Sequence, residues 1–441
     1  MTKQNNININ MSWDKEVIAA EKKCERSLLI DLTGEGDLKT KHKERPPVNL
    51  AIVIDCSGSM EGAPIEAAKS AAKQITEKLT QKDRLSIVTF DSEIETHFSN
   101  IRMDESGASY AQGVISEIYT RGMTNLSGGW FEGARCVTKA IDEGVFKDGF
   151  VVVLSDGMAN RGITHPKELL MHASELSSRG IQTTSIGIGA HYSPLQLDAL
   201  AEGGQGRLHD TETAEDIIDV VLGELGEIGN TIAKNVKLHI HYPRPVELKC
   251  LSKLKGEKSG SYYNIDIGNL QLNQTRSVAL LTEIFDRRLG HSVYFEVHAT
   301  WDDINTGERL ESKVENSSIK VVSVDEADSV KINTKVVQKV ADLWEASLAY
   351  EAMMFNEEGR FDMASSLFES NKMSYNMIID PLEDSRERLD RFQSAHRKVN
   401  SPWMGRSKRA SINMSKKMMM GESSLLKRDT GEWYDELKNN S

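Results

Sequence analysis

The sequence predicts a doubly wound α/β domain with a mostly parallel six-stranded sheet, an antiparallel β-sandwich and a C-terminal α-helical region. Three segments of different periodicity support this fold class. Residues 48–230 alternate strand patterns with helical patterns, which is typical of a parallel sheet covered by helices on both faces. Residues 231–324 alternate apolar and polar side chains with a period of two, as half-buried antiparallel strands do. Beyond residue 325 the apolar residues recur at helical spacing.

The chain is expected to divide where this periodicity changes. A charged linker that ends in Pro46 and Pro47 separates the first strands from the α/β domain. Those first strands are candidates to complete the sandwich, so we expect the α/β domain to be an insertion in it. The expected segments are residues 1–46 (N-terminal strands of the sandwich), 47–230 (α/β domain), 231–325 (sandwich), 326–400 (helical hairpin region) and 401–441 (basic, methionine-rich flexible tail).

Within the α/β domain, buried β-branched runs predict strands and apolar residues three and four positions apart predict helices. Pro64 stands at a first-turn position, where the missing N–H of proline removes no helical hydrogen bond. We expect a first strand that begins at residue 49. Five further strands are expected at 84–91, 94–98, 149–155, 182–187 and 207–210. We expect helices over residues 64–79, 127–140, 166–178, 195–201 and 213–228.

The sandwich and the helical region follow from the same two periods. Residues 7–13 and 26–33 alternate like strands ahead of the linker, and the later strands are expected at 236–242, 262–267, 277–284, 292–301 and 318–324. A long helix is expected over 336–355, a second opens at 361–368, and a third covers 383–397. The first two resemble a helical hairpin of tetratricopeptide type, although the sequence shows one unit and no array.

Oxygen-bearing side chains gather where the first buried strand ends. Asp55 is followed by Ser57 and Ser59, and two later segments bring Thr124 before a helix and Asp156 at the end of another strand. Because ligands of a parallel sheet collect beyond the carboxyl ends of its strands, we expect these oxygens to meet at one point. Carboxylate and hydroxyl oxygens suit a hard divalent cation such as Mg²⁺.

These five residues, in this order, resemble the metal-ion-dependent adhesion site of von Willebrand factor type A domains, and the resemblance covers roughly residues 47–230. It implies that Asp55, Ser57, Ser59, Thr124 and Asp156 hold Mg²⁺, with Mn²⁺ or Ca²⁺ as alternatives. It also implies that a protein partner donates an Asp or Glu to the outward-facing position of the cation. A type A domain inserted in a β-sandwich is similar to bacterial proteins of this class and to the inter-α-trypsin inhibitor heavy chains.

Side chains beside the expected metal ligands are candidates for a partner-binding rim. Methionines there suit an adaptable contact surface, because their side chains are flexible and polarisable. The expected rim consists of Met60, Glu61, Met123, Asn125, Met158, Asn160 and Arg161.

The motif segments favour binding over catalysis. They contain no histidine that could act as a general base and resemble no two-metal carboxylate cluster, so we predict that the protein is not an enzyme. His191 is interpreted as a solvent-exposed loop residue. His239 and His241 share one face of a strand without a third ligand nearby, and we interpret them as part of a solvated strand face.

Composition and charge limit which classes of protein the chain can belong to. The 441 residues are 39% hydrophobic and 27% charged, as in ordinary globular proteins, and the net charge of −12 argues against a general nucleic-acid-binding surface. No stretch reaches the about 20 apolar residues of a membrane span. We see no secretory signal, and the four scattered cysteines form no C-x-x-C pair, so we expect a cytoplasmic protein.

Two functions stay open at this point. The first is a cation-dependent adaptor in a multi-protein intracellular assembly, with an AAA ATPase among the candidate partners. The alternative is a nucleic-acid-associated factor that acts through the basic segment 386–417, with a structural metal site. A steep loss of binding with added salt that disappears on removing residues 401–441 would favour the alternative.

Overall fold

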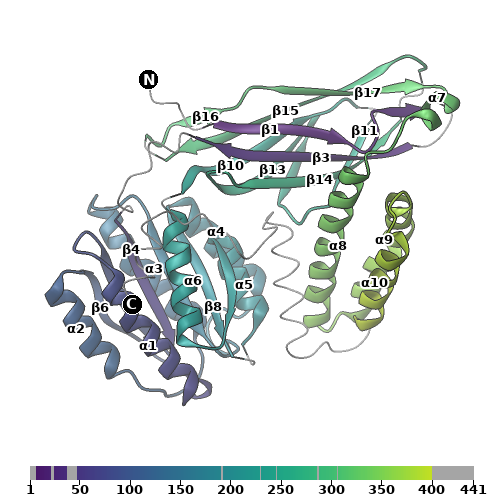
Figure 1. Cartoon of the computed structure of the whole chain (residues 1–441). Helices are drawn as coiled ribbons and strands as arrows, with labels where there is room; N and C mark the ends of the chain where they lie inside the picture. Colours follow the sequence, from purple (N-terminus) through teal and green to yellow (C-terminus); the bar gives the residue numbers. More distant parts are fainter. Residues whose placement is uncertain are drawn as a thin grey trace. The chain divides into compact units, whose positions relative to one another are not determined.

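The computed structural model describes residues 6–20, 24–36, 47–189, 192–228, 230–244, 246–285, 288–304 and 306–399 (Figure 1). They form two compact units, and each is described by itself. Residues 47–230 make one unit, and the described residues before 37 and after 230 make the other. The expected tail over 401–441 and most of the charged linker lie outside the described residues.

The first unit is built on a six-stranded sheet in the order β6-β5-β4-β7-β8-β9. The β6 edge strand is antiparallel to β5, and the other neighbours are parallel. The strands are β4 (Asn49–Asp55), β5 (Arg84–Phe90), β6 (Ile94–Arg102), β7 (Gly149–Ser155), β8 (Ile181–Ile188) and β9 (Gln205–Thr211). The helices are α1 (Ala63–Lys78), α2 (Glu105–Ser116), α3 (Leu126–Asp142), α4 (Pro166–Ser178), α5 (Pro194–Gly203) and α6 (Ala214–Ile228).

Helices cover both faces of this sheet, and the central strand β4 shows why. All of its residues are buried, as expected for a strand with an apolar layer on each side. Ile52 and Ile54 belong to the core shared with α1, α2 and α6, while Ala51 and Val53 belong to the core shared with α3, α4 and α5. The predicted doubly wound α/β fold class is therefore confirmed.

The helix α2 has no counterpart among the predicted elements. Its sequence contains two glycines, and its buried face has only two apolar residues, Ala111 and Ile115. This is too little periodicity for a prediction by apolar spacing. The helix is started instead by Asp104, whose side chain accepts a hydrogen bond from the Gly107 N–H at 2.9 Å and so caps the first turn.

The second unit contains two mostly antiparallel sheets that share one apolar core. The order of the first sheet is β1-β3-β14-β11, and that of the second is β12-β13-β10-β15-β17-β2, with β16 paired to β15. The first sheet has β1 (Asn6–Trp13), β3 (Cys24–Glu35), β11 (Val246–Cys250) and β14 (Thr275–Ile284). The second has β2 (Val17–Ala19), β10 (Thr231–His241), β12 (Gly256–Ser259), β13 (Tyr262–Gln271), β15 (Ser292–Asp303), β16 (Arg309–Glu311) and β17 (Glu315–Val322).

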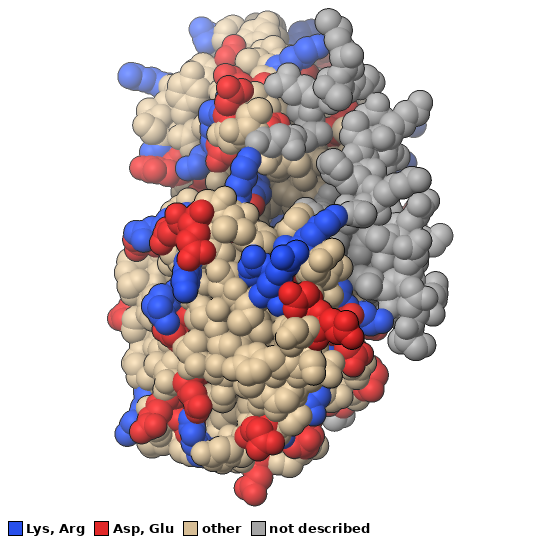
Figure 2. Space-filling model, turned by 90° about the vertical axis from the view of Figure 1, so that its left-hand side faces the viewer, with Lys and Arg blue, Asp and Glu red and all other residues tan. Residues whose placement is uncertain are grey.

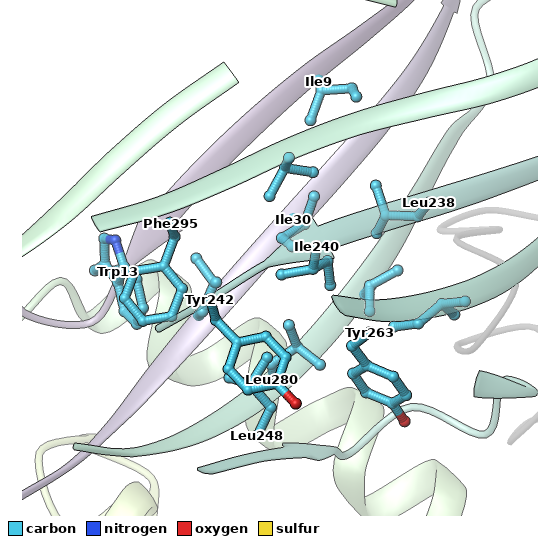
Figure 3. Packing of buried hydrophobic residues seen from close by; sticks show 14 of the residues in the cluster. Ile9, Trp13, Ile30, Leu238, Ile240, Tyr242, Leu248, Tyr263, Leu280 and Phe295 are labelled. Atoms are coloured by element: carbon cyan, nitrogen blue, oxygen red, sulfur yellow. The ribbon is translucent and has the colours of Figure 1, made fainter. Parts of the chain in front are cut away.

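Strands that precede the α/β domain in sequence pair with strands that follow it. The early strand β3 runs beside β14 from Thr33 opposite Thr275 to Cys24 opposite Ile284. Figure 3 shows the shared core, in which Trp13 packs edge-on against Phe295 with ring centres 5.0 Å apart. Burial of this contact, together with the aliphatic side chains of the same core, stabilises the packing of the two sheets.

Four helices complete this unit: α7 (Val324–Ser329), α8 (Thr334–Glu357), α9 (Phe361–Ile379) and α10 (Ser385–Lys398). Leu29 and Leu281 of the first sheet share an apolar cluster with Val340 of α8. In the same cluster Tyr375 of α9 stacks on Phe392 of α10 with ring centres 4.7 Å apart. None of the described helices is long and apolar enough to cross a membrane.

Candidate metal centre

The first predicted ligand, Asp55, is the last residue of β4 and is fully buried. Its two carboxylate oxygens have separate partners. One accepts the Ser57 backbone N–H at 2.8 Å, and the other accepts the Ser155 hydroxyl at 2.5 Å. These bonds fix the orientation of the carboxylate, because each oxygen is held from a different strand end.

The two serines stand on the turn that follows β4. A short 3₁₀ helix, η2 (Gly58–Met60), lifts Ser59 to the surface while Ser57 stays buried. The Ser57 and Ser59 hydroxyl oxygens are 3.1 Å apart, and the Ser59 hydroxyl donates to the Asp156 carboxylate at 2.8 Å. A chain of hydrogen bonds thus joins the end of β4 to the residue that follows β7.

Thr124 completes the group from the loop before α3. A methyl carbon placed on Gly157 would lie 3.2 Å from Ser59 Oγ, 3.6 Å from Thr124 Oγ1 and 3.8 Å from Asp55 Oδ2. The hydroxyl of Thr124 therefore faces the same small space as the serine and aspartate oxygens. The structure brings all five sequence-predicted residues to one edge of the sheet, and their oxygens are a donor set that fits Mg²⁺.

The electrostatics of the group also fit a cation. Burial raises the pKa of Asp55 to about 6, against the hydrogen bonds from Ser155 and Ser57, and the nearby charge of Asp156 raises it further. Two carboxylates, those of Asp55 and Asp156, are thus buried close together, where water solvates their negative charges poorly. A divalent cation among these oxygens would neutralise both charges.

One predicted rim residue is wrong. Met60 is fully buried and belongs to the core beneath α1, because the 3₁₀ turn that exposes Ser59 directs the next side chain inward. Five of the other rim residues, Glu61, Met123, Met158, Asn160 and Arg161, are exposed, and Asn125 is half-buried.

The side-chain oxygens of the two rim asparagines accept hydrogen bonds from backbone N–H groups of the protein. Asn125 caps α3 by accepting the Gly128 N–H at 3.1 Å. Asn160 accepts the Thr124 N–H at 3.1 Å. Their side chains therefore position the loops around the candidate centre, which the sequence did not indicate.

Three further residues that brace these loops were not singled out by the sequence. Gln196 of α5 accepts the Ala159 N–H at 2.8 Å and donates to the Thr164 carbonyl at 3.0 Å, which holds the loop after Asp156. Asp91 and Arg121 hold the loop that carries Thr124. Asp91 is the last residue of a predicted strand, 84–91, and its position at the carboxyl end of that strand is the one sequence feature that could have indicated it.

The two histidines considered on one strand, His239 and His241, lie on β10 and have partners within the second unit. His239 lies partly buried on the second sheet of the sandwich, with its ring nitrogens 2.7 Å from Asn264 Oδ1 and 2.9 Å from Thr300 Oγ1. His241 lies 3.7 Å from a Glu296 oxygen. His191 lies outside the described residues.

Comparison with known proteins defines the class of the first unit. Residues 49–221 match the model of the von Willebrand factor type A domain. The chain therefore contains a domain of this family, whose members typically mediate protein–protein interactions.

Several individual proteins resemble the chain. Protein sll0103 of Synechocystis sp. is 26% identical over 306 residues, which cover 67% of this chain and 70% of that protein. Inter-α-trypsin inhibitor heavy chain H3 of Rattus norvegicus is 25% identical over 201 residues, 45% of this chain and 22% of the heavy chain. Protein YfbK of Escherichia coli is 27% identical over 210 residues, 46% of this chain and 35% of YfbK. The matched region thus spans only about a fifth to a third of the last two relatives.

Two solved structures share the fold over most of the chain. A von Willebrand factor type A protein from Catenulispora acidiphila has a TM-score of 0.62 at 16% identity and covers 86% of this chain and 90% of its own. The ArnB paralog VWA2 from Sulfolobus acidocaldarius has a TM-score of 0.53 at 16% identity. The match covers 95% of this chain and 99% of the VWA2 chain. At this identity the likeness shows the fold alone.

Proposed function

We propose that this protein is a divalent-cation-dependent interaction module, which holds an acidic side chain of a protein partner through Mg²⁺ bound by Asp55, Ser57, Ser59, Thr124 and Asp156. The observation that carries the proposal is the convergence of the Ser59, Thr124 and Asp55 oxygens on the point where a Gly157 Cβ would lie, with Ser57 and Asp156 hydrogen-bonded to Ser59. The family match of residues 49–221 supports a binding role.

Each part of the centre has a role in this function. When bound, the cation supplies a coordination position that a partner carboxylate can occupy. Ser155 and the Ser57 N–H keep the Asp55 carboxylate aimed at the centre, and the Ser59 hydroxyl holds Asp156. Met123 and Met158 are 48% and 61% exposed, so they are available for apolar contact with a docked partner.

The proposal extends to the setting of the protein. We propose a cytoplasmic adaptor in a multi-protein assembly, with an AAA ATPase among the candidate partners, and no enzymatic activity. The donor set supports the last point alone, since it contains hydroxyls and two carboxylates but no histidine or third acid that could act as a general base. Mn²⁺ and Ca²⁺ are alternative cations.

The nucleic-acid alternative has no observation in its favour. Arg388, in the basic segment 386–417, is 3% exposed and is paired with Asp342, Glu345 and Asp384, so it is not available to a phosphate. Residues beyond 400 lie outside the described part of the chain. On the face shown in Figure 2, acidic and basic side chains lie interspersed rather than separated by sign.

Titration calorimetry with Mg²⁺, Mn²⁺ and Ca²⁺ in turn tests the metal site directly. We expect one cation to bind per chain, with full release by EDTA. If none of the three cations binds at millimolar concentration, the proposed site does not exist.

Replacing Gly157 with alanine is expected to weaken cation binding by at least about 10-fold without unfolding the domain. This is the lower end of the loss in metal affinity that changes beside metal ligands typically cause. The added methyl would occupy the space among the donor oxygens, yet its nearest neighbour would lie at 3.2 Å. Gly113→Ala is the matched control, since its methyl would meet nothing within 4 Å. Equal Mn²⁺ affinity of the two variants in calorimetry would show that Gly157 does not face the cation.

A further inference from the structure

Asp91 is hydrogen-bonded to the loop that carries Thr124, at residues on both sides of Thr124. It follows β5, the strand next to β4, and is 3% exposed. Its carboxylate accepts the Arg121 Nε–H at 2.9 Å, and its backbone carbonyl accepts the Asn125 N–H at 2.9 Å. The other carboxylate oxygen accepts the Glu93 N–H at 2.6 Å, so the side chain is fixed by its own turn.

The same loop is tied to the turn that carries the two serines. The Arg121 N–H donates to the Cys56 carbonyl at 2.6 Å, and the Gly122 carbonyl accepts the Gly58 N–H at 3.2 Å. Gly122 has a φ of 64°, and a Cβ there would come within 3.0 Å of the Asp91 carboxylate. A glycine is needed here because the loop passes so close to Asp91 in a left-handed conformation.

On its far side, Thr124 is held by the loop that follows Asp156. Its N–H donates to Asn160 Oδ1 at 3.1 Å, and its carbonyl accepts the Asn160 and Arg161 N–H groups at 3.1 and 3.2 Å. The position of the Thr124 hydroxyl is thus determined from two directions, by Asp91 through residues 121 and 125, and by the 160–161 backbone.

We propose that Asp91 is a positioning residue of the metal centre, which sets the Thr124 hydroxyl against Ser59 and Asp55 and thereby sets the affinity for the cation. The inference rests on the proposed function and adds a residue to it. Asp91 is not a ligand, since Arg121 and the Glu93 N–H occupy its carboxylate. Partners that orient metal ligands typically change metal affinity 10–100-fold when they are lost.

A double-mutant cycle tests the proposal in the full-length chain. Mn²⁺ affinity is measured by calorimetry for the wild type, Asp91→Asn, Thr124→Ala and the double variant. We expect Asp91→Asn to weaken binding about 10–100-fold. Because Asp91 acts through Thr124, the double variant is expected to bind no more weakly than Thr124→Ala alone, as for two residues of one network.

Glu95→Gln is the matched control, because Glu95 binds the other arm of Arg121 at 2.9 Å but is 50% exposed. We expect its Mn²⁺ affinity to stay within about 2-fold of the wild type, as for an exposed ion pair. Wild-type affinity in Asp91→Asn, or fully additive losses in the double variant, would overturn the proposal. If Asp91→Asn does not fold, Arg121→Gln tests the same contact from its other side. A wild-type protein that binds no Mn²⁺ would instead refute the metal site itself.

Discussion

Replacing Asp55 with alanine is expected to abolish Mg²⁺ and Mn²⁺ binding and capture of the protein partner, while the α/β domain stays folded. The variant removes one of two carboxylates and releases the Ser57 N–H and the Ser155 hydroxyl from their acceptor. The loss in affinity should exceed the 10–100-fold that is typical of an outer-shell change. Calorimetry measures the affinity, and circular dichroism follows the fold.

The fold is expected to survive because the loss of these hydrogen bonds is offset. The raised pKa of Asp55 shows that its buried carboxylate is disfavoured when no cation is bound, so its removal relieves a desolvation cost. Asp83→Asn is a matched control, since Asp83 is equally buried but accepts the Val48 N–H at the opposite end of β4. Loss of cation binding in the control would mean that any buried aspartate of the domain supports the site indirectly.

Replacing Arg388 with alanine is expected to destabilise the helices α8 to α10 by about 3 kcal/mol, the lower end of the cost of breaking a buried ion pair. Its guanidinium contacts Asp342 at 2.6 Å, Glu345 at 3.0 Å and Asp384 at 3.0 Å, while only 3% of the side chain is exposed. We expect the lower end of that range because the three acidic side chains are 20–41% exposed.

Hydrogen exchange is the appropriate measurement, because a chain with two compact units need not unfold in one step. Protection of the α8–α10 amides should fall about 100-fold in Arg388→Ala, as 3 kcal/mol requires. Arg391→Ala is the control on the same helix, since Arg391 is 54% exposed and lies 3.4 Å from Glu345. If both variants exchange alike, Arg388 is not a central contact of the helical region.

The fold class and the candidate ligands could be predicted because both are recorded in local sequence patterns. Buried strands such as β4 appear as apolar runs, and their ends mark where ligands of a parallel sheet gather. Asp55 ends one such strand and Asp156 directly follows another, while Thr124 lies in the loop between α2 and α3. The structure adds that their oxygens face one space.

Features set by contacts between distant loops could not be predicted. Met60 is predicted to be a rim residue because it follows Ser59 in the sequence, but the 3₁₀ turn directs its side chain into the core. Asp91 and Arg121 act through contacts across 30 positions of sequence, and Gln196 braces a loop from another helix. The helix α2 is stabilised by its cap and two buried residues rather than by an apolar stripe.

The most direct test of cation bridging is affinity capture from native extract on the immobilised protein, with Mg²⁺ or with EDTA. We predict that a partner is retained in Mg²⁺, is released by EDTA and is absent from Asp55→Ala under both conditions. Retention of the same partner in EDTA, or on Asp55→Ala, would contradict the account.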